Sequence, residues 1–208
     1  MKPHFQPALP RMLALVAVIG LTARATSAAE TATGVGSTFT KNGATYTARH
    51  VLHSSLQTAD LLSICFDFKH LQGFYHESEL KLLKTAADTQ EVEYRSDYTV
   101  CTSSAIYSKT LDRAHNTVRF TLLDHQVSGW GMPVMTASAG SYVISNNGKL
   151  RSITYEQSVT LKHEIGVVDW TLIQRKSAEF FTDFDAYVRQ QEALPAKPAA
   201  SQKPATTP

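Results

Sequence analysis

The chain has 208 residues, of which 20 are Lys or Arg and 18 are Asp or Glu, so its formal charge at pH 7 is +2. Hydrophobic residues make up 43% of the sequence, which is enough for a buried core and excludes a wholly disordered chain. The sequence has no run of basic residues and no large positive charge, so nucleic acid is not an expected partner.

The N-terminal region has the features of a secretory signal peptide. Lys2 and Arg11 precede an apolar run of ten residues, 12–21, and small residues follow it. A run of ten is about half the length that a membrane span needs, which favours cleavage over a retained anchor. We therefore predict a signal peptide over residues 1–28 and a periplasmic or secreted protein.

Three regions are expected in the mature chain. Residues 29–43 are rich in Thr and Gly and predict a polar lead. Residues 193–208 contain four prolines and predict a disordered tail, because they offer almost no apolar surface to bury. The remaining residues, 44–192, suffice for one core, so we expect a single folded domain.

Two cysteines, Cys65 and Cys101, belong to this domain. An even number of cysteines in an exported protein permits a disulfide, and the alternative is two separate buried thiols. Neither cysteine belongs to a C-x-x-C motif, so a zinc or dithiol redox site is not expected.

The predicted elements run in the order strand, two helices, strands, helix. A loosely alternating segment, 44–53, predicts the first strand, and the apolar spacing within 55–77 predicts two short helices. Alternating or β-rich segments then predict strands over 78–88, 90–100, 104–112 and 117–125. Two more strands form a hairpin over 141–161, which gives about seven strands in an antiparallel sheet.

The hairpin turn is expected at Asn147-Gly148, because this dipeptide accommodates two positive φ angles. A two-residue turn there would pair Asn146 with Lys149, Ile144 with Arg151 and Tyr142 with Ile153. One face of the hairpin would be apolar and would carry Tyr142, Ile144, Ile153, Tyr155, Val159 and Leu161. Such a face needs a cover.

The C-terminal helix, expected over 167–191, provides that cover. At 100° per residue one stripe forms that is apolar except for the small polar Ser177, and it contains Trp170, Ile173, Ser177, Phe181, Phe184 and Val188. The opposite side carries Arg175, Glu179, Thr182 and Asp183. We predict that the stripe packs against the sheet.

This order of elements resembles the START-like superfamily of the helix-grip (SRPBCC) type, which includes polyketide cyclases, coenzyme-Q-binding proteins and START lipid-transfer domains. The segment "LLSICFDFKHLQGFYHESELKLLK" is similar to that family's helix, acidic residue, second helix and strand. The segment "GSYVISNNGKLRSITYEQSV" resembles its penultimate hairpin, in which an aromatic residue follows Gly by two positions. The resemblance implies an α+β fold in which a curved antiparallel sheet wraps around the last helix.

The resemblance also implies a cavity between sheet and helix that binds a lipid, sterol, quinone or polyketide-like molecule. The residues alone support an apolar interface, and a filled core is the alternative, since native cores are densely packed. Several tyrosines and Ser177 on the inner faces favour an apolar space with a few polar groups. The expected ligand contacts are Tyr94, Tyr98, Phe120, Leu122, Tyr142, Ile144, Ile153, Tyr155, Trp170, Ile173, Ser177, Phe181 and Phe184.

Catalysis and cofactors are not required by any motif in the chain. His50 and His53 form an H-x-x-H, but residues three apart on a strand point to opposite faces and do not share a metal ion. There is no P-loop, dinucleotide fingerprint or G-x-S-x-G motif. Two alternatives to a carrier stay open: a cyclase- or dehydratase-type enzyme that uses the same cavity, and an interaction module that makes envelope or membrane contacts.

Overall fold

The computed structural model describes residues 36–76, 78–99, 101–129 and 131–194, which form one α+β unit. In chain order the elements are β1 (Gly36–Asn42), β2 (Thr45–Ser54), α1 (Thr58–Phe66), α2 (Phe68–Phe74), β3 (Glu79–Ala86), β4 (Thr89–Asp97), β5 (Cys101–Asp112), β6 (Thr117–Gly129), β7 (Met135–Asn147), β8 (Leu150–Leu161) and α3 (Val167–Glu192). The predicted signal peptide and all but the first two residues of the predicted tail lie outside the described residues.

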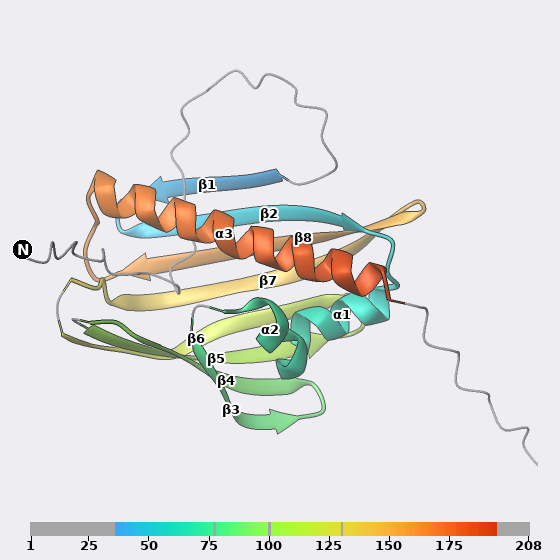
Figure 1. Cartoon of the computed structure of the whole chain (residues 1–208), viewed down its shortest axis with the longest axis horizontal. Helices are drawn as coiled ribbons and strands as arrows, with labels where there is room; N and C mark the ends of the chain where they lie inside the picture. Colours follow the sequence, from blue (N-terminus) through green and yellow to red (C-terminus); the bar gives the residue numbers. More distant parts are fainter. Residues whose placement is uncertain (1–35, 77, 100, 130, 195–208) are drawn as a thin grey trace, which may run out of the picture.

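All strands belong to one antiparallel sheet with the order β1-β2-β8-β7-β6-β5-β4-β3. Figure 1 shows the long helix α3 lying over the β2 and β8 half of the sheet, while α1 and α2 lie beside it over the other half. The three helices therefore cover the same face. This is the predicted helix-grip arrangement. Among the described residues, no helix is both long and apolar enough to cross a membrane.

The sheet has eight strands because part of the predicted polar lead is a strand. β1 pairs with β2 through a two-residue turn, with Asn42 opposite Thr45 and Gly43 at a φ of 58°. A glycine at the first central position of a tight hairpin turn supplies the positive φ that this turn type needs. The Asn42-Gly43 dipeptide was thus a hairpin signal, which the polar composition of 29–43 obscured. The described part of the sheet therefore begins at Gly36, within the predicted lead.

The β7–β8 hairpin has the predicted faces but a different register. Asn147 pairs with Leu150, so the turn residues are Gly148 and Lys149, and Tyr142 lies opposite Tyr155. Only Gly148 takes a positive φ, 64°, whereas Asn147 stays in the strand. Each residue's partner is shifted by two positions from the predicted one, and a shift of two preserves the face on which a side chain lies. The six apolar side chains predicted for one face are all buried.

The buried side of α3 is also the predicted one. Ile173, Ser177, Phe181, Phe184 and Val188 are buried, and Trp170 is partly buried against the ring of Tyr46. The side chains predicted for the opposite side are exposed. Helical spacing alone was sufficient to predict the buried side of α3, because a helix with a single apolar stripe can bury only that side.

Cys65 and Cys101 are free, buried thiols, so the possible disulfide between them was wrong. The backbone of Cys65 lies beside Lys109, whose Nζ is 2.9 Å from the Cys65 carbonyl oxygen. Lys109 and Cys101 both belong to β5 and lie eight residues apart, a separation of about 26 Å along a strand. Cys65 of α1 therefore lies too far from Cys101, at the other end of β5, for a bridge to form.

Candidate hydrophobic ligand site

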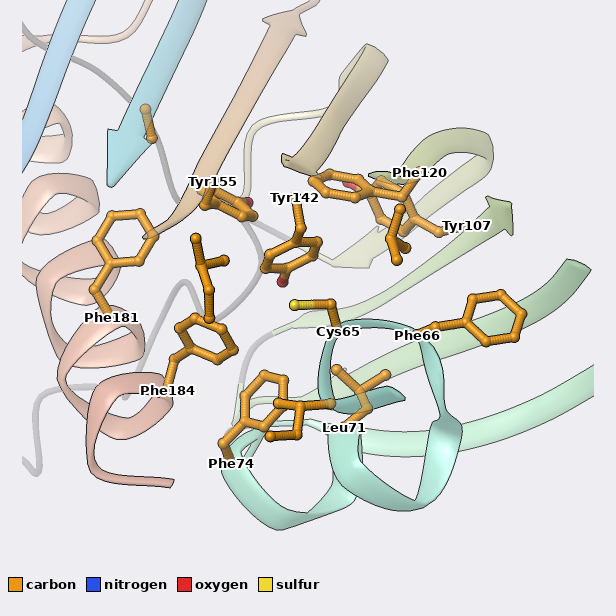
Figure 2. Packing of buried hydrophobic residues seen from close by; sticks show 14 of the residues in the cluster. Cys65, Phe66, Leu71, Phe74, Tyr107, Phe120, Tyr142, Tyr155, Phe181 and Phe184 are labelled. Carbon is orange, nitrogen blue, oxygen red and sulfur yellow. The ribbon is translucent and has the colours of Figure 1, made fainter. Parts of the chain in front are cut away.

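Aromatic rings follow one another across the helix-covered face of the sheet (Figure 2). They come from five central strands, since residues that lie opposite one another in adjacent antiparallel strands share a face. The ring centroids are 5.6 Å apart for Tyr94 and Tyr107, 6.2 Å for Tyr107 and Phe120, 5.7 Å for Phe120 and Tyr142, and 5.0 Å for Tyr142 and Tyr155. We call these five residues the aromatic row.

The helices supply further rings that face the row. Phe181 of α3 lies 5.3 Å from Tyr155, and Phe184 lies 5.8 Å from Tyr142. Phe74 of α2 lies 5.1 Å from Phe184 and completes the contact between the helices. In Figure 2 the ring of Tyr142 lies between the sheet side chains and Cys65 of α1. The apolar interior is thus bounded by the sheet and all three helices.

Most of the predicted ligand contacts meet in this interior. Nine of them are buried in the core: Phe120, Tyr142, Ile144, Ile153, Tyr155, Ile173, Ser177, Phe181 and Phe184. Three are partly buried against it: Tyr94, Leu122 and Trp170. Tyr98 differs, because it lies beyond the end of β4 in the connection to β5. The role of all thirteen residues as ligand contacts, Tyr98 included, stays a prediction.

Sequence reasoning missed several residues of the interior, including Tyr107, Phe74 and Gln157. Tyr107 lies on β5 two residues from Ala105 and from Lys109, all on the inner face. The period of two was readable for this strand, but Ser and Lys residues within it hid the apolar side. Gln157 of β8 likewise lies on the inner face, two residues from each of the predicted inner residues Tyr155 and Val159.

Polar groups inside the core form a short chain. The Tyr155 hydroxyl donates to Gln157 Oε1 over 2.5 Å, and Gln157 Nε2 donates to Ser138 Oγ over 2.9 Å. Ser177 Oγ donates to the carbonyl of Ile173 over 2.8 Å. Among the described residues, Gln90 Oε1 is a buried side-chain oxygen without a hydrogen-bond partner. An unpaired buried acceptor costs free energy, so a ligand hydroxyl or a water molecule would be stabilised there.

Burial keeps the tyrosines of the row un-ionised. It raises the pKa of Tyr107 to about 12, although hydrogen bonds with Ser138 and Gln157 oppose the shift. Burial also raises the pKa values of Tyr142 and Tyr155 well above the ordinary value of a tyrosine, and neighbouring tyrosines add to the effect. These hydroxyls are therefore hydrogen-bonding groups at physiological pH, and they are poor proton acceptors.

Lys109 is a buried lysine, 4% exposed, on the inner face of β5 toward the C-terminal end of that strand. Its Nζ donates to the carbonyl oxygens of Cys65 and Phe66, each over 2.9 Å. These carbonyls belong to the last turn of α1, where backbone oxygens have no partner within the helix. Burial lowers the pKa of Lys109 to about 8, while Cys65 and Asp67 act in the opposite direction. Lys109 thus fixes the end of α1 to the sheet.

The pKa of Lys109 predicts that stability changes with pH. The folded-state pKa lies below the ordinary lysine value of about 10.4, so the unfolded chain binds more protons between these values and stability rises with pH. Between about pH 7 and pH 9 we expect the free energy of unfolding of the wild type to rise by on the order of 1 kcal/mol relative to Lys109→Met. Urea unfolding of both proteins at each pH measures this difference. A difference that is flat or falls with pH would contradict the expectation.

His50 and His53 point to opposite faces of β2, as predicted. His50 is buried on the inner face, whereas His53 is partly buried on the other. The part of the chain that the structure describes holds no group of three or more His, Cys, Asp or Glu side chains that could bind a metal ion.

The chain is similar to proteins of known structure, although its sequence matches no family model and no curated protein. A STAR-related lipid transfer protein from Xanthomonas axonopodis is similar to the chain with a TM-score of 0.53 and 11% identity, over 74% of this chain and 99% of that one. A START superfamily protein from Mycobacterium smegmatis has a TM-score of 0.53 and 12% identity, over 70% and 98%. The Zhui aromatase/cyclase from Streptomyces sp. R1128 has a TM-score of 0.50 and 11% identity, over 71% and 95%.

These similarities span the described domain and nearly the whole of each solved chain. At such low identity these similarities show only that the backbones are arranged in the same way. The ligand and the chemistry must be inferred from the residues of this chain. The sheet, the paired short helices and the long last helix all correspond. The chain therefore has the helix-grip fold of START-like proteins, which confirms the resemblance at the level of the fold.

Proposed function

We propose that this protein is exported and that it binds or carries a hydrophobic small molecule, such as a lipid, sterol, quinone or polyketide-like compound, between its sheet and α3. The observation that carries the proposal is the aromatic row, in which four of five side chains are tyrosines on the covered face of the sheet. A core that served only for packing would gain nothing from these hydroxyls, each of which needs a partner.

The polar groups of the interior also support a ligand. Apolar ligand sites usually contain a few polar groups that orient the bound molecule. Here Gln90 offers an unpaired acceptor, and Tyr155, Gln157 and Ser138 offer a hydrogen-bonded chain. The signal-peptide pattern of residues 1–28 supports export. The names of the similar structures, a lipid transfer protein and an aromatase/cyclase, agree with a hydrophobic ligand.

Replacing Ser177 by Trp tests the proposal. Ser177 is fully buried on the side of α3 that faces the sheet. If there is room for a ligand there, the indole fills it, so we expect a melting temperature close to that of the wild type and loss of binding of the fluorescent fatty acid cis-parinaric acid. If the space is filled core, overpacking destabilises the variant by about 1–3 kcal/mol.

Thr182→Trp is the matched control, because Thr182 makes the same kind of hydrogen bond, to the carbonyl of Ala178 over 2.8 Å, but lies on the exposed side of α3. It should bind the probe as the wild type does. Strong destabilisation of Ser177→Trp, or a stable Ser177→Trp protein that binds cis-parinaric acid normally, would count against a site at this position. Mass spectrometry of lipids that co-purify with the wild type would then identify the natural class of ligand.

A further inference from the structure

A serine of β1, a histidine of β2 and an aspartate of α3 form a line of hydrogen bonds at one edge of the sheet. Ser37 Oγ of β1 lies 2.8 Å from His50 Nδ1, and His50 Nε2 lies 2.9 Å from Asp185 Oδ1 of α3. His50 is 1% exposed and the side chain of Asp185 is 16% exposed, whereas Ser37 is exposed to solvent. A nucleophile, a base and a group that orients the base are arranged in this way in serine hydrolases.

The partners of His50 determine where its protons lie. A carboxylate only accepts hydrogen bonds, so Nε2 must carry a proton that it donates to Asp185. In the neutral ring Nδ1 then has a lone pair and accepts the hydrogen of the Ser37 hydroxyl. Phe181 stacks on the imidazole with ring centroids 4.3 Å apart and planes 4° from parallel. The ring is therefore held in the orientation that a general base for Ser37 needs.

A second serine–histidine pair in the same sheet shows the opposite arrangement. The backbone N–H of Met135 donates to His125 Nδ1 over 2.9 Å, so in the neutral ring Nε2 carries the proton. That Nε2 lies 3.1 Å from Ser103 Oγ and donates to it. Burial lowers the pKa of His125 and favours this neutral form. His125 thus cannot take a proton from Ser103, which is itself buried.

The register of the strands places one more group beside Ser37. The N–H of Leu161 in β8 donates to the carbonyl of Ala44, and alternate residues direct their backbone groups to the same side. His50 lies six residues after Ala44, which is an even number, so the backbone N–H and C=O of His50 also point toward β8. Ser37 lies opposite His50 in a pair without mutual backbone hydrogen bonds, so its N–H points away from β2. A serine's own N–H is a suitable donor to the oxyanion of an acyl-transfer reaction.

We propose that Ser37 and His50, positioned by Asp185, form a serine nucleophile site for carboxylic esters with an apolar acyl chain. The preference for an apolar chain follows from Phe39, two residues along β1 on the same face as Ser37, whose ring lies 6.2 Å from that of Phe181. The proposal concerns the edge of the sheet and does not depend on the ligand site of the interior.

The reaction balances with water as the second substrate. Ser37 Oγ attacks the ester carbonyl carbon while its proton moves to His50 Nδ1, and the ester C–O bond then breaks as the alkoxide takes that proton and leaves as an alcohol. Water attacks the resulting acyl-serine and gives its proton to Nδ1. The acid is released when Ser37 Oγ regains a proton from His50.

Labelling of the full-length protein with a fluorophosphonate probe tests the site. We expect one adduct, on Ser37, found by peptide mass spectrometry, and no comparable adduct on Ser128, an exposed serine of β6 that serves as an internal reference. Ser37→Ala should abolish the adduct, and Ser103→Ala should leave it unchanged. Ser37 is exposed, so its replacement by Ala does not disturb the core. No adduct on Ser37, or equal labelling of Ser37 and Ser128, would overturn the proposal.

Hydrolysis of p-nitrophenyl butyrate tests the positioning role of Asp185. In Asp185→Asn the ring of His50 keeps a partner but loses the carboxylate that fixes its tautomer, so we expect kcat to fall at least about 100-fold with KM little changed. An unchanged kcat in a folded Asp185→Asn protein would show that the contact is only structural and would overturn the triad. Should that variant fail to fold, the comparison of Ser37 with Ser128 in the wild type decides the question.

Discussion

At about pH 11 the protein is expected to have lost roughly 3–4 kcal/mol of its folding free energy because three buried tyrosines of the aromatic row resist ionisation. Tyr107, Tyr142 and Tyr155 are 5–6% exposed, and burial raises the pKa of each in the folded state. The un-ionised tyrosines contribute fully to stability below the ordinary tyrosine pKa of about 10. This contribution is lost as the pH rises toward the higher pKa values of the folded state. One pH unit above 10, each tyrosine accounts for on the order of 1 kcal/mol.

Two other buried groups act in the same range and approximately cancel one another. Burial raises the pKa of Cys65 to about 12, which reduces stability above the ordinary thiol range, whereas the lowered pKa of Lys109 increases stability in alkali. The net loss approaches the lower end of the stability of a typical domain, about 5–15 kcal/mol, so we expect cooperative alkaline unfolding. Tyrosinate absorbance and far-ultraviolet circular dichroism should change together. Early ionisation of these tyrosines in a chain that stays folded would show that solvent reaches the row.

Gly140→Ala is expected to destabilise the protein by about 3 kcal/mol, the upper part of the range for overpacking. A Cβ at Gly140 would lie 2.3 Å from the backbone oxygen of Glu156 and 2.4 Å from the ring of Phe120. Phe120 pairs with Gly140 across β6 and β7, and its ring lies against the space that a side chain would occupy. The Glu156 oxygen is part of the sheet and cannot move aside, so the strands must separate.

Gly36→Ala is the matched control, since a Cβ there meets nothing within 4 Å and the residue has no positive φ. Its melting temperature should equal that of the wild type. Urea unfolding gives both free energies, and the stability of Gly140→Ala would contradict the expectation if it fell within about 0.5 kcal/mol of the control.

The buried faces of the strands and of α3 could be predicted from the sequence, because the spacing of apolar residues repeats every two residues in a strand and about every 3.6 residues in a helix. β8 and α3 each carry most of their apolar residues on one side. Because both elements pack against the same core, that side must face inward. The register of β7 and β8 could not be predicted in this way. Both possible turns keep the same faces, and the choice depends on which residue takes a positive φ, here Gly148.

The polar part of the interior was harder to predict, because its residues resemble surface residues. Lys109 looks like an exposed residue of an alternating strand, and only the position of α1 shows that two carbonyl groups receive its ammonium. His50 was considered only with His53, its neighbour in sequence. Its actual partners, Ser37 and Asp185, lie 13 and 135 residues away, and no local pattern connects them.

The pairing of β2 with β8 has a consequence for how the chain folds. Thr45 and Thr160, whose hydroxyls are 3.1 Å apart, are separated by 115 residues, so this pair of neighbouring strands joins the two ends of the described domain. Contacts between such distant residues require the closure of a long loop and slow folding toward the millisecond-to-second range. The ribosome must release almost the entire domain before this pairing can form. A nascent chain that stays unfolded for so long suits the proposed export, because a translocation channel can accept it before the sheet is complete.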